Sequence, residues 1–261
     1  MKAANTLMSW PSALRSRWWR VVRNLNTSAT LLALVVAPSS YQRGRREAIA
    51  RQLYLGTAPM LPWFTVLVAM VSLVLIHIVV VTAASYGLSQ YALEAVIRVL
   101  VLELIPLVCA LFVAVNVTLP GGVALARRRA RLAAEGLGLD ALQTEAMARV
   151  LAGAFAVVTL AVVSGVVALV LTYLSVHGLT LAAFDAFTRK VGQVFNPAVA
   201  LILVLKTLFF SLAVALIPVL AGLNPAPRLA GRPALAEVQG LVRMFLLILL
   251  IEVFSLVGNY Y

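Results

Sequence analysis

Three ionisable residues stand inside strongly apolar stretches of the sequence, where a charge needs a partner. Glu103, Lys206 and Glu252 lie in three separate hydrophobic stretches. Ionisable groups within a membrane span are costly and usually face a bundle interior or a cavity. Two carboxylates and one ammonium at a common depth would offset one another's desolvation. We therefore predict a polar cluster of these residues, in which Lys206 is expected to pair with Glu252 in preference to Glu103. Its role is either an interhelical tie or a contact with a lipid head group.

Two prolines and two histidines are the other residues of chemical interest. Pro106 follows Glu103 by three residues, and Pro218 lies in the same apolar stretch as Lys206. Each proline should bend its helix and free backbone carbonyls, which then need other partners or line a cavity. His77 stands alone among aliphatic residues, which favours a core histidine over a proton relay. His177 has no Cys or carboxylate at ligand spacing, so no metal site is expected.

Enzyme motifs are missing from the sequence. It has no hydrolytic nucleophile motif, no zinc-binding HExxH, no Walker A loop and no glycine-rich dinucleotide fingerprint. We therefore expect no catalytic residues and no cofactor bound by this chain. If ATP drives its activity, a separate subunit must bind the nucleotide.

The elements that position the charged residues follow from composition. The 261 residues are 63% hydrophobic and 11% charged, whereas soluble domains carry roughly a quarter charged residues. A membrane-spanning helix needs roughly 20 apolar residues, and such windows recur at 60–83, 99–124, 150–174, 198–221 and 241–258. The sequence predicts an all-α membrane protein of about five transmembrane helices.

The basic residues predict the orientation of these spans. Of the 21 Lys and Arg residues, nine precede the first span and five lie at 127–149, but only Arg98, Arg189 and Lys190 lie in the two loops of the other side. Under the positive-inside rule, the N-terminus is cytoplasmic and the C-terminus is outside. The cations beside spans argue against nucleic-acid binding. This orientation puts the three charged residues in the outer half of the bilayer, roughly 7–12 Å below the outer helix ends.

Amphipathic segments flank the spans. Residues 1–56 mix Trp and Arg with aliphatic residues, which is typical of interfacial helices on the cytoplasmic leaflet, although a disordered basic tail is the alternative for the first part. Within this region, 29–37 is too short to span and is interpreted as an interfacial element, and 44–55 as an amphipathic helix leading into the first span. A further short helix is expected within 175–197. The spans themselves form the second region, 57–258.

The basic segment between the second and third spans is a candidate docking site. It runs over 127–142 and carries four clustered cations, Arg127, Arg128, Arg129 and Arg131. Two interpretations remain open for it. It either contacts a cytoplasmic partner or serves only as a solvated topology signal.

The second span resembles a signature of the MlaE/YrbE permeases. Residues 102–116 read LELIPLVCALFVAVN, against a family text close to RELGPVLTALLVAGR. Glu103, Pro106 and Ala110 are among the matches, whereas Leu102 and Asn116 replace the family's arginines. Further matches follow in the expected order: Tyr86-Gly87, Asp140, Arg149-Val-Leu-Ala152, Leu205-Lys-Thr-Leu-Phe-Phe210, Gly222 and Ile251-Glu-Val-Phe254.

The resemblance implies a fold, partners and a substrate class. It implies a permease that dimerises, with itself or with a related chain, in the bacterial inner membrane. An ABC ATPase subunit would lie below it and an MCE-domain substrate-binding protein above it, and the complex would move phospholipid or a related lipid between the inner and outer membranes. The segment 125–142 replaces the family's ATPase-contacting helix in a shortened form. A non-transporting scaffold or assembly subunit derived from such a permease is the alternative.

Overall fold

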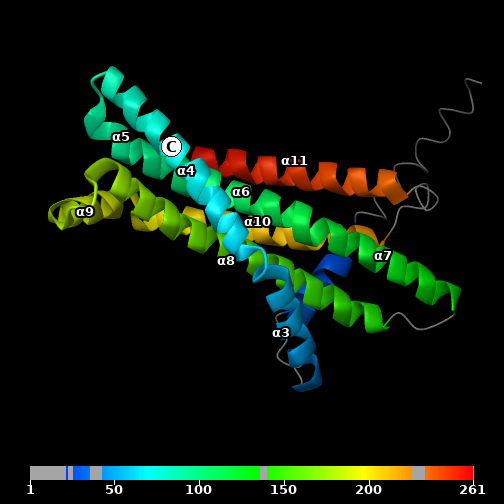
Figure 1. Cartoon of the computed structure of the whole chain (residues 1–261). Coiled ribbons are helices and arrows are strands. Elements are labelled where there is room, and N and C mark those ends of the chain that lie inside the picture. The colour runs from blue at the N-terminus through cyan, green and yellow to red at the C-terminus, as the bar shows by residue number, and fades with distance from the viewer. Residues whose placement is uncertain (1–21, 23–25, 36–42, 136–139, 225–232, 261) are drawn as a thin grey trace, which may run out of the picture.

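The computed structural model describes residues 22, 26–35, 43–135, 140–224 and 233–260. Within these ranges the chain is helical and contains no β-strand. Five helical stretches are long and apolar enough to cross a membrane: Ile49–Ser85, Ser89–Ala134, Leu142–His177, Pro197–Leu223 and Gly240–Gly258. They run roughly lengthwise in one bundle (Figure 1). The predicted fold class of an all-α protein with five potential spans is confirmed.

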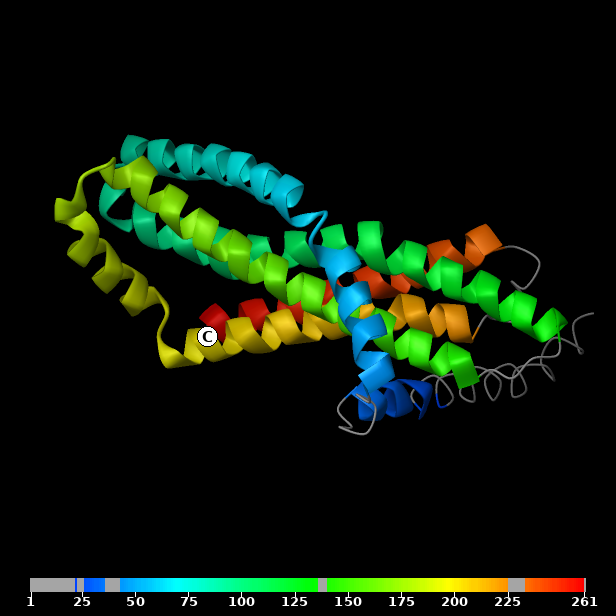
Figure 2. The ribbon, with the colours of Figure 1, turned by 60° about the horizontal axis from the view of Figure 1, so that its bottom comes forward.

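The first span begins with a helix that is not parallel to the rest of the bundle. Helix α3 (Arg43–Thr57) crosses the bundle at a steep angle and is followed by α4 (Leu61–Ser85) (Figure 2). The break between them coincides with Pro62 at the start of α4, where a missing N–H is tolerated. A helix is present where an amphipathic helix was predicted over 44–55; Ile49 of the predicted apolar face is buried, whereas Tyr54 is exposed. Gly87, with a φ of 72°, makes the tight turn into the second span.

The second span is one long helix interrupted by two wider turns. It consists of α5 (Ser89–Val96), the π-helical η2 (Ile97–Leu104), α6 (Ile105–Val113), the π-helical η3 (Ala114–Thr118) and α7 (Leu119–Ala134). Helices of the π type are rare and frequently occur at functional sites. Segment η2 contains Glu103, and η3 contains Asn116. Both positions belong to the signature stretch.

The remaining helices complete the bundle. Helix α8 (Asp140–His177) returns beside the second span, and the short η4 (Leu181–Ala183) and α9 (Phe184–Val194) follow at the end of the bundle opposite the α7–α8 connection (Figure 2). Helix α9 confirms the short helix expected within 175–197. Helix α10 (Pro197–Leu223) starts at Asn196, whose side chain accepts a hydrogen bond from the backbone N–H of Val199 at 2.8 Å. Helix α11 (Pro233–Tyr260) ends the described chain.

Small residues allow α10 to lie against α7 at backbone distance. A Cβ atom added to Gly122 would lie 2.5 Å from the Pro218 carbonyl oxygen, and one added to Gly222 would lie 2.5 Å from the Gly122 carbonyl oxygen. Neither position tolerates a side chain without movement of the helices. Such close packing is how membrane helices associate without a strong hydrophobic driving force between them.

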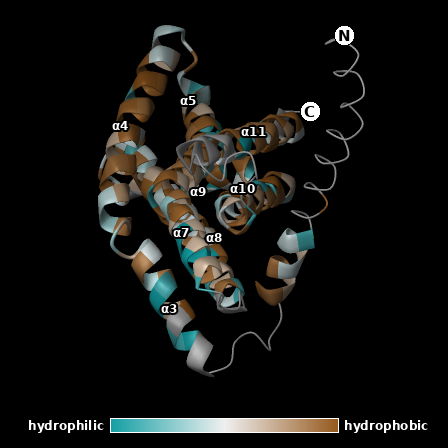
Figure 3. Ribbon diagram, turned by 90° about the vertical axis from the view of Figure 1, so that its right-hand side faces the viewer, coloured by the Kyte–Doolittle hydropathy of each residue, from teal (hydrophilic) through white to brown (hydrophobic). Residues whose placement is uncertain are grey.

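The surface pattern agrees with a protein embedded in lipid. Large apolar side chains are exposed on the outer helices, including Trp63, Met70 and Leu249. Hydrophilic residues gather instead on α3 and on the ends of α7 and α8 (Figure 3). His77 also has an exposed side chain on α4, so the interpretation as a core histidine is wrong. Its neighbour Ile76 is the buried residue of this turn, because only one face of α4 contacts the bundle.

The region before the first span is described only in part. Helix 26–35 has Leu31 buried beside Leu125 and Leu142, which agrees with a partly buried element. The Trp- and Arg-rich segment before it lies mostly outside the described residues. The inward N-terminus and outward C-terminus stay a prediction, and so does the division at residue 56.

Candidate functional site

Lys206 is the centre of an ion-pair cluster between three spans. Its side chain is 1% exposed, and its Nζ lies 2.9 Å from Glu252 Oε2 of α11. It also forms an ion pair with Glu103 of η2. The structure thus brings together the three residues singled out by their depth, and Lys206 contacts both carboxylates.

Pro106 explains a second contact of the same ammonium. A proline has no N–H, so Pro106 cannot donate a hydrogen bond to the Leu102 carbonyl four residues earlier. Lys206 Nζ lies 3.3 Å from that carbonyl oxygen and donates to it. The freed carbonyl expected from the sequence therefore has a side-chain partner from α10. Pro106 itself is buried at the start of α6.

The charges of the cluster define what it can bind. The ammonium is also 5.8 Å from the centroid of the Phe210 ring, within the range of a cation–π contact. Two carboxylates against one ammonium leave one formal negative charge in an apolar setting. The side chains of Glu103 and Glu252 remain 12% and 13% exposed. The arrangement favours a proton or a cationic group as an additional ligand, because either would neutralise the excess charge.

The candidate docking residues lie at the other end of the second span. Arg127, Arg128, Arg129 and Arg131 belong to the last turns of α7, and α8 begins at Asp140 after a gap in the described chain. Three of these arginines are exposed and Arg129 is half-buried. Arg128 is engaged within the protein, because its Nη1 lies 2.6 Å from Glu145 Oε2.

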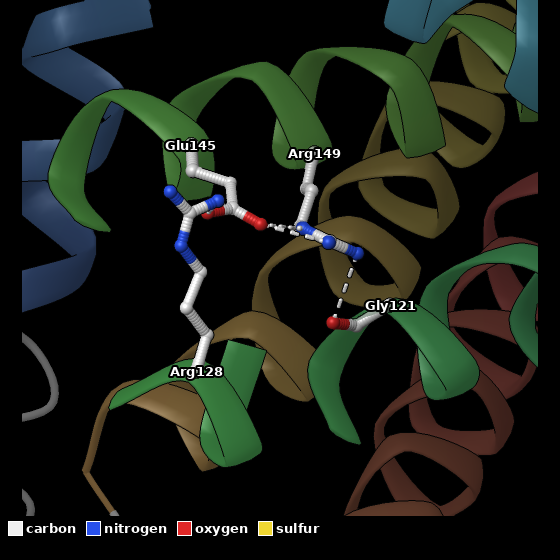
Figure 4. Close-up of polar contacts among 4 residues, drawn as sticks. All are labelled: Gly121, Arg128, Glu145 and Arg149. Atoms are coloured by element: carbon white, nitrogen blue, oxygen red, sulfur yellow. Dashed lines mark hydrogen bonds and ion pairs between the residues drawn. The ribbon is translucent and has the colours of Figure 1, made fainter. Parts of the chain in front are cut away.

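Glu145 lies between Arg128 and Arg149 and forms an ion pair with each (Figure 4). Glu145 was not singled out from the sequence. Its Oε1 accepts hydrogen bonds from Arg149 Nη2 at 2.8 Å and from Arg149 Nε at 3.2 Å. Arg149 Nη1 donates in turn to the Gly121 carbonyl oxygen at 3.1 Å. The i, i+4 spacing of Glu145 and Arg149 is a sequence signal for the helical pair. No sequence signal indicates the contact to Gly121, which depends on how α7 and α8 cross.

Comparison with known protein families assigns this chain to one of them. The family model described as "Permease MlaE" matches residues 49–257, which is most of the chain. No curated protein matches. The match includes the five potential spans except for the last residue of the fifth, and it contains the ion-pair cluster. The chain is a multi-pass membrane protein, and it belongs to the MlaE permease family.

Proposed function

We propose that this chain is the membrane-embedded permease subunit of an MCE-type ABC transporter, and that it moves phospholipid or a related lipid between the inner and outer membranes of a bacterium. ATP is hydrolysed on a separate ABC subunit. An MCE-domain protein exchanges lipid at the outer side, and a second permease copy, identical or related, completes a dimer. The family match over residues 49–257 carries this proposal.

The ion-pair cluster supports a path for a polar head group. An apolar bundle does not need a buried Lys206 with two carboxylates for stability, because ion pairs in low dielectric often contribute little beyond well-packed apolar residues. The cluster also lies beside π-helical η2, which begins at Ile97 and ends at Leu104. We propose that Glu103, Pro106, Lys206 and Glu252 line the route of the lipid head group.

The end of α7 supports the contact with the ATPase. Arg127, Arg129 and Arg131 project from the end of a helix that is continuous with the span carrying Glu103. A movement of this end of α7 would be transmitted to the Lys206 cluster, because both belong to the same continuous helix. We propose these arginines, with Arg128 and Asp140, as the coupling contact.

Co-purification from native membranes tests the proposal. The full chain should retain an ABC ATPase in stoichiometric amount, and the complex should contain extractable phospholipid. Replacing Arg127, Arg129 and Arg131 by Gln should lower the retained ATPase several-fold, while Arg128 stays paired with Glu145. The matched control removes the exposed cations of α9, Arg189→Gln and Lys190→Gln, and should leave retention unchanged.

A different result identifies the alternative function. A complex that contains neither ATPase nor phospholipid would reject transport and favour the scaffold subunit. Unchanged retention after the three α7 substitutions would reject the coupling contact alone.

A further inference from the structure

A second polar site lies at the basic end of the bundle, away from the Lys206 cluster. A cavity of about 160 Å³ is lined by Gln52 and Gly56 of α3, Thr118 of η3, Gly121 of α7, Arg149 of α8 and Val219 of α10. Thr118 is 15 residues beyond Glu103 on the second span, which corresponds to roughly 20 Å along a helix. The cavity and the ion-pair cluster are therefore distinct sites.

Arg149 gives the cavity its chemical character. Its guanidinium has five N–H donors. The contacts to Glu145 and to the Gly121 carbonyl use three of them and fix the plane of the group. The side chain is 20% exposed, so it is largely shielded and still accessible from the cavity. Two guanidinium donors remain for a ligand.

The neighbouring residues complete a site for an anion. Arg128, Glu145 and Arg149 together carry one formal positive charge. The half-buried Gln52 adds an amide at the cavity wall. A Cβ atom at Gly121 would lie 3.1 Å from Arg149 Nη1, so glycine leaves room for the guanidinium at this place. A fixed guanidinium with a nearby amide suits the oxygens of a phosphate group.

The position of the cavity indicates where the phosphate comes from. Its α3 wall belongs to the helix that carries Arg43, Arg45, Arg46 and Arg51, and Tyr54 and Leu55 of the same helix are 68% and 55% exposed. Cations beside exposed aromatic and aliphatic side chains mark the level of lipid head groups. Beyond Arg149 and Ala152, α8 continues as an apolar span. The cavity therefore lies at the boundary between head groups and acyl chains.

We propose that this cavity binds the phosphate group of an anionic membrane lipid, with Arg149 as the main ligand and Gln52 as a second donor. This lipid is a fixed ligand between α3 and the bundle, and it is not the transported lipid. The proposal does not depend on transport, since it requires only the cavity, the guanidinium and the surrounding membrane.

Lipid binding to the delipidated full chain in detergent tests the proposal. Native mass spectrometry should show saturable binding of one phosphatidylglycerol, and much weaker binding of a diacylglycerol with the same acyl chains. Arg149→Leu should weaken phosphatidylglycerol binding about tenfold or more, because hydrogen bonds to charged groups contribute on that scale. Arg149→Lys should restore part of the affinity.

Two further variants separate binding from folding. Gln52→Glu introduces a carboxylate at the cavity wall, leaves Arg149 in place and should also reduce binding about tenfold. Arg189→Gln removes one cation from α9 at the opposite end of the bundle, leaves the cavity and its charges unchanged, and should bind lipid as the wild type does.

The outcomes are distinct. Wild-type affinity in both Arg149→Leu and Gln52→Glu, or equal affinity for diacylglycerol, would overturn the proposal. Displacement of phosphatidylglycerol by inorganic phosphate at a similar concentration would assign the cavity to a soluble phosphate and overturn the lipid assignment.

Discussion

A single residue, Lys206, connects three membrane-spanning helices through polar contacts to residues far away in the sequence. Lys206 is paired with Glu103, 103 residues earlier, and with Glu252 of the last helix. It also donates to the Leu102 carbonyl, to which Pro106 cannot donate. One ammonium therefore links three helices, and its loss would leave two carboxylates uncompensated in an apolar environment.

Lys206→Met should destabilise the folded protein by about 3 kcal/mol or more, because removing one partner of a buried ion pair leaves an unpaired charge. Thermal unfolding of the purified chain in detergent measures this as a lower midpoint temperature. The triple variant Lys206→Met, Glu103→Gln, Glu252→Gln removes all three charges and should recover most of the loss. A wild-type midpoint in Lys206→Met alone would contradict the structural role of the ammonium.

Among the helices, the crossing of α7 and α10 depends on backbone contact. Gly122 and Gly222 face each other across it, and Pro218 lies at the same place. The two helices contact each other through main-chain atoms here, so the separation of α7 and α10 is set by the absence of side chains. The basic residues lie at the end of α7, beyond this crossing. The crossing therefore determines their position relative to the bundle.

Gly122→Ala and Gly222→Ala should each destabilise the protein by about 1–3 kcal/mol, since overpacking forces the backbones apart. Gly192→Ala on α9 is the matched control, because a Cβ atom there has no neighbour within 4 Å. The control should be neutral or slightly stabilising, as alanine is the better helix former. Thermal unfolding in detergent compares the three variants. Equal midpoints would show that the α7–α10 crossing is not close-packed.

The sequence predicted the helices better than it predicted how they are interrupted. Apolar windows located all five potential spans, because the bilayer requires a long uncharged helix wherever it is crossed. The π-helical turns η2 and η3 were not predicted, since they depend on how neighbouring helices pack and not on a residue pattern. The Lys206 cluster was predictable because charges in apolar spans are few, and their depths can be compared. The Arg149 cavity was not, because residues from five elements form it.

As a whole, the molecule is a bundle with chemically different ends. One end carries α3 and the basic end of α7, and the other carries the Gly87 turn and α9. The polar sites are likewise separated, with Lys206 toward the second end and Arg149 toward the first. Under the positive-inside rule, the basic residues of the first end predict that this end faces the cytoplasm.

Cysteine labelling should reveal this orientation directly. The single native cysteine, Cys109, is fully buried and gives no background in the folded protein. In spheroplasts, a membrane-impermeant maleimide should label Leu179→Cys, at a position that is 90% exposed near α9. It should label Ala133→Cys, at the exposed end of α7, only after lysis. The reverse pattern would invert the proposed topology.

The distance in sequence between Glu103 and Lys206 also has a consequence for biosynthesis. The ribosome adds about 5–20 residues per second, so roughly 5–20 s pass between the synthesis of the carboxylate and that of its cation. During this interval Glu103 and the Leu102 carbonyl lack the Lys206 ammonium that contacts both of them in the folded protein. The second span therefore stays in the membrane without these contacts until the fourth span arrives. A product truncated before Lys206 can never form these contacts, so we expect it to be less stable in the membrane than the full chain.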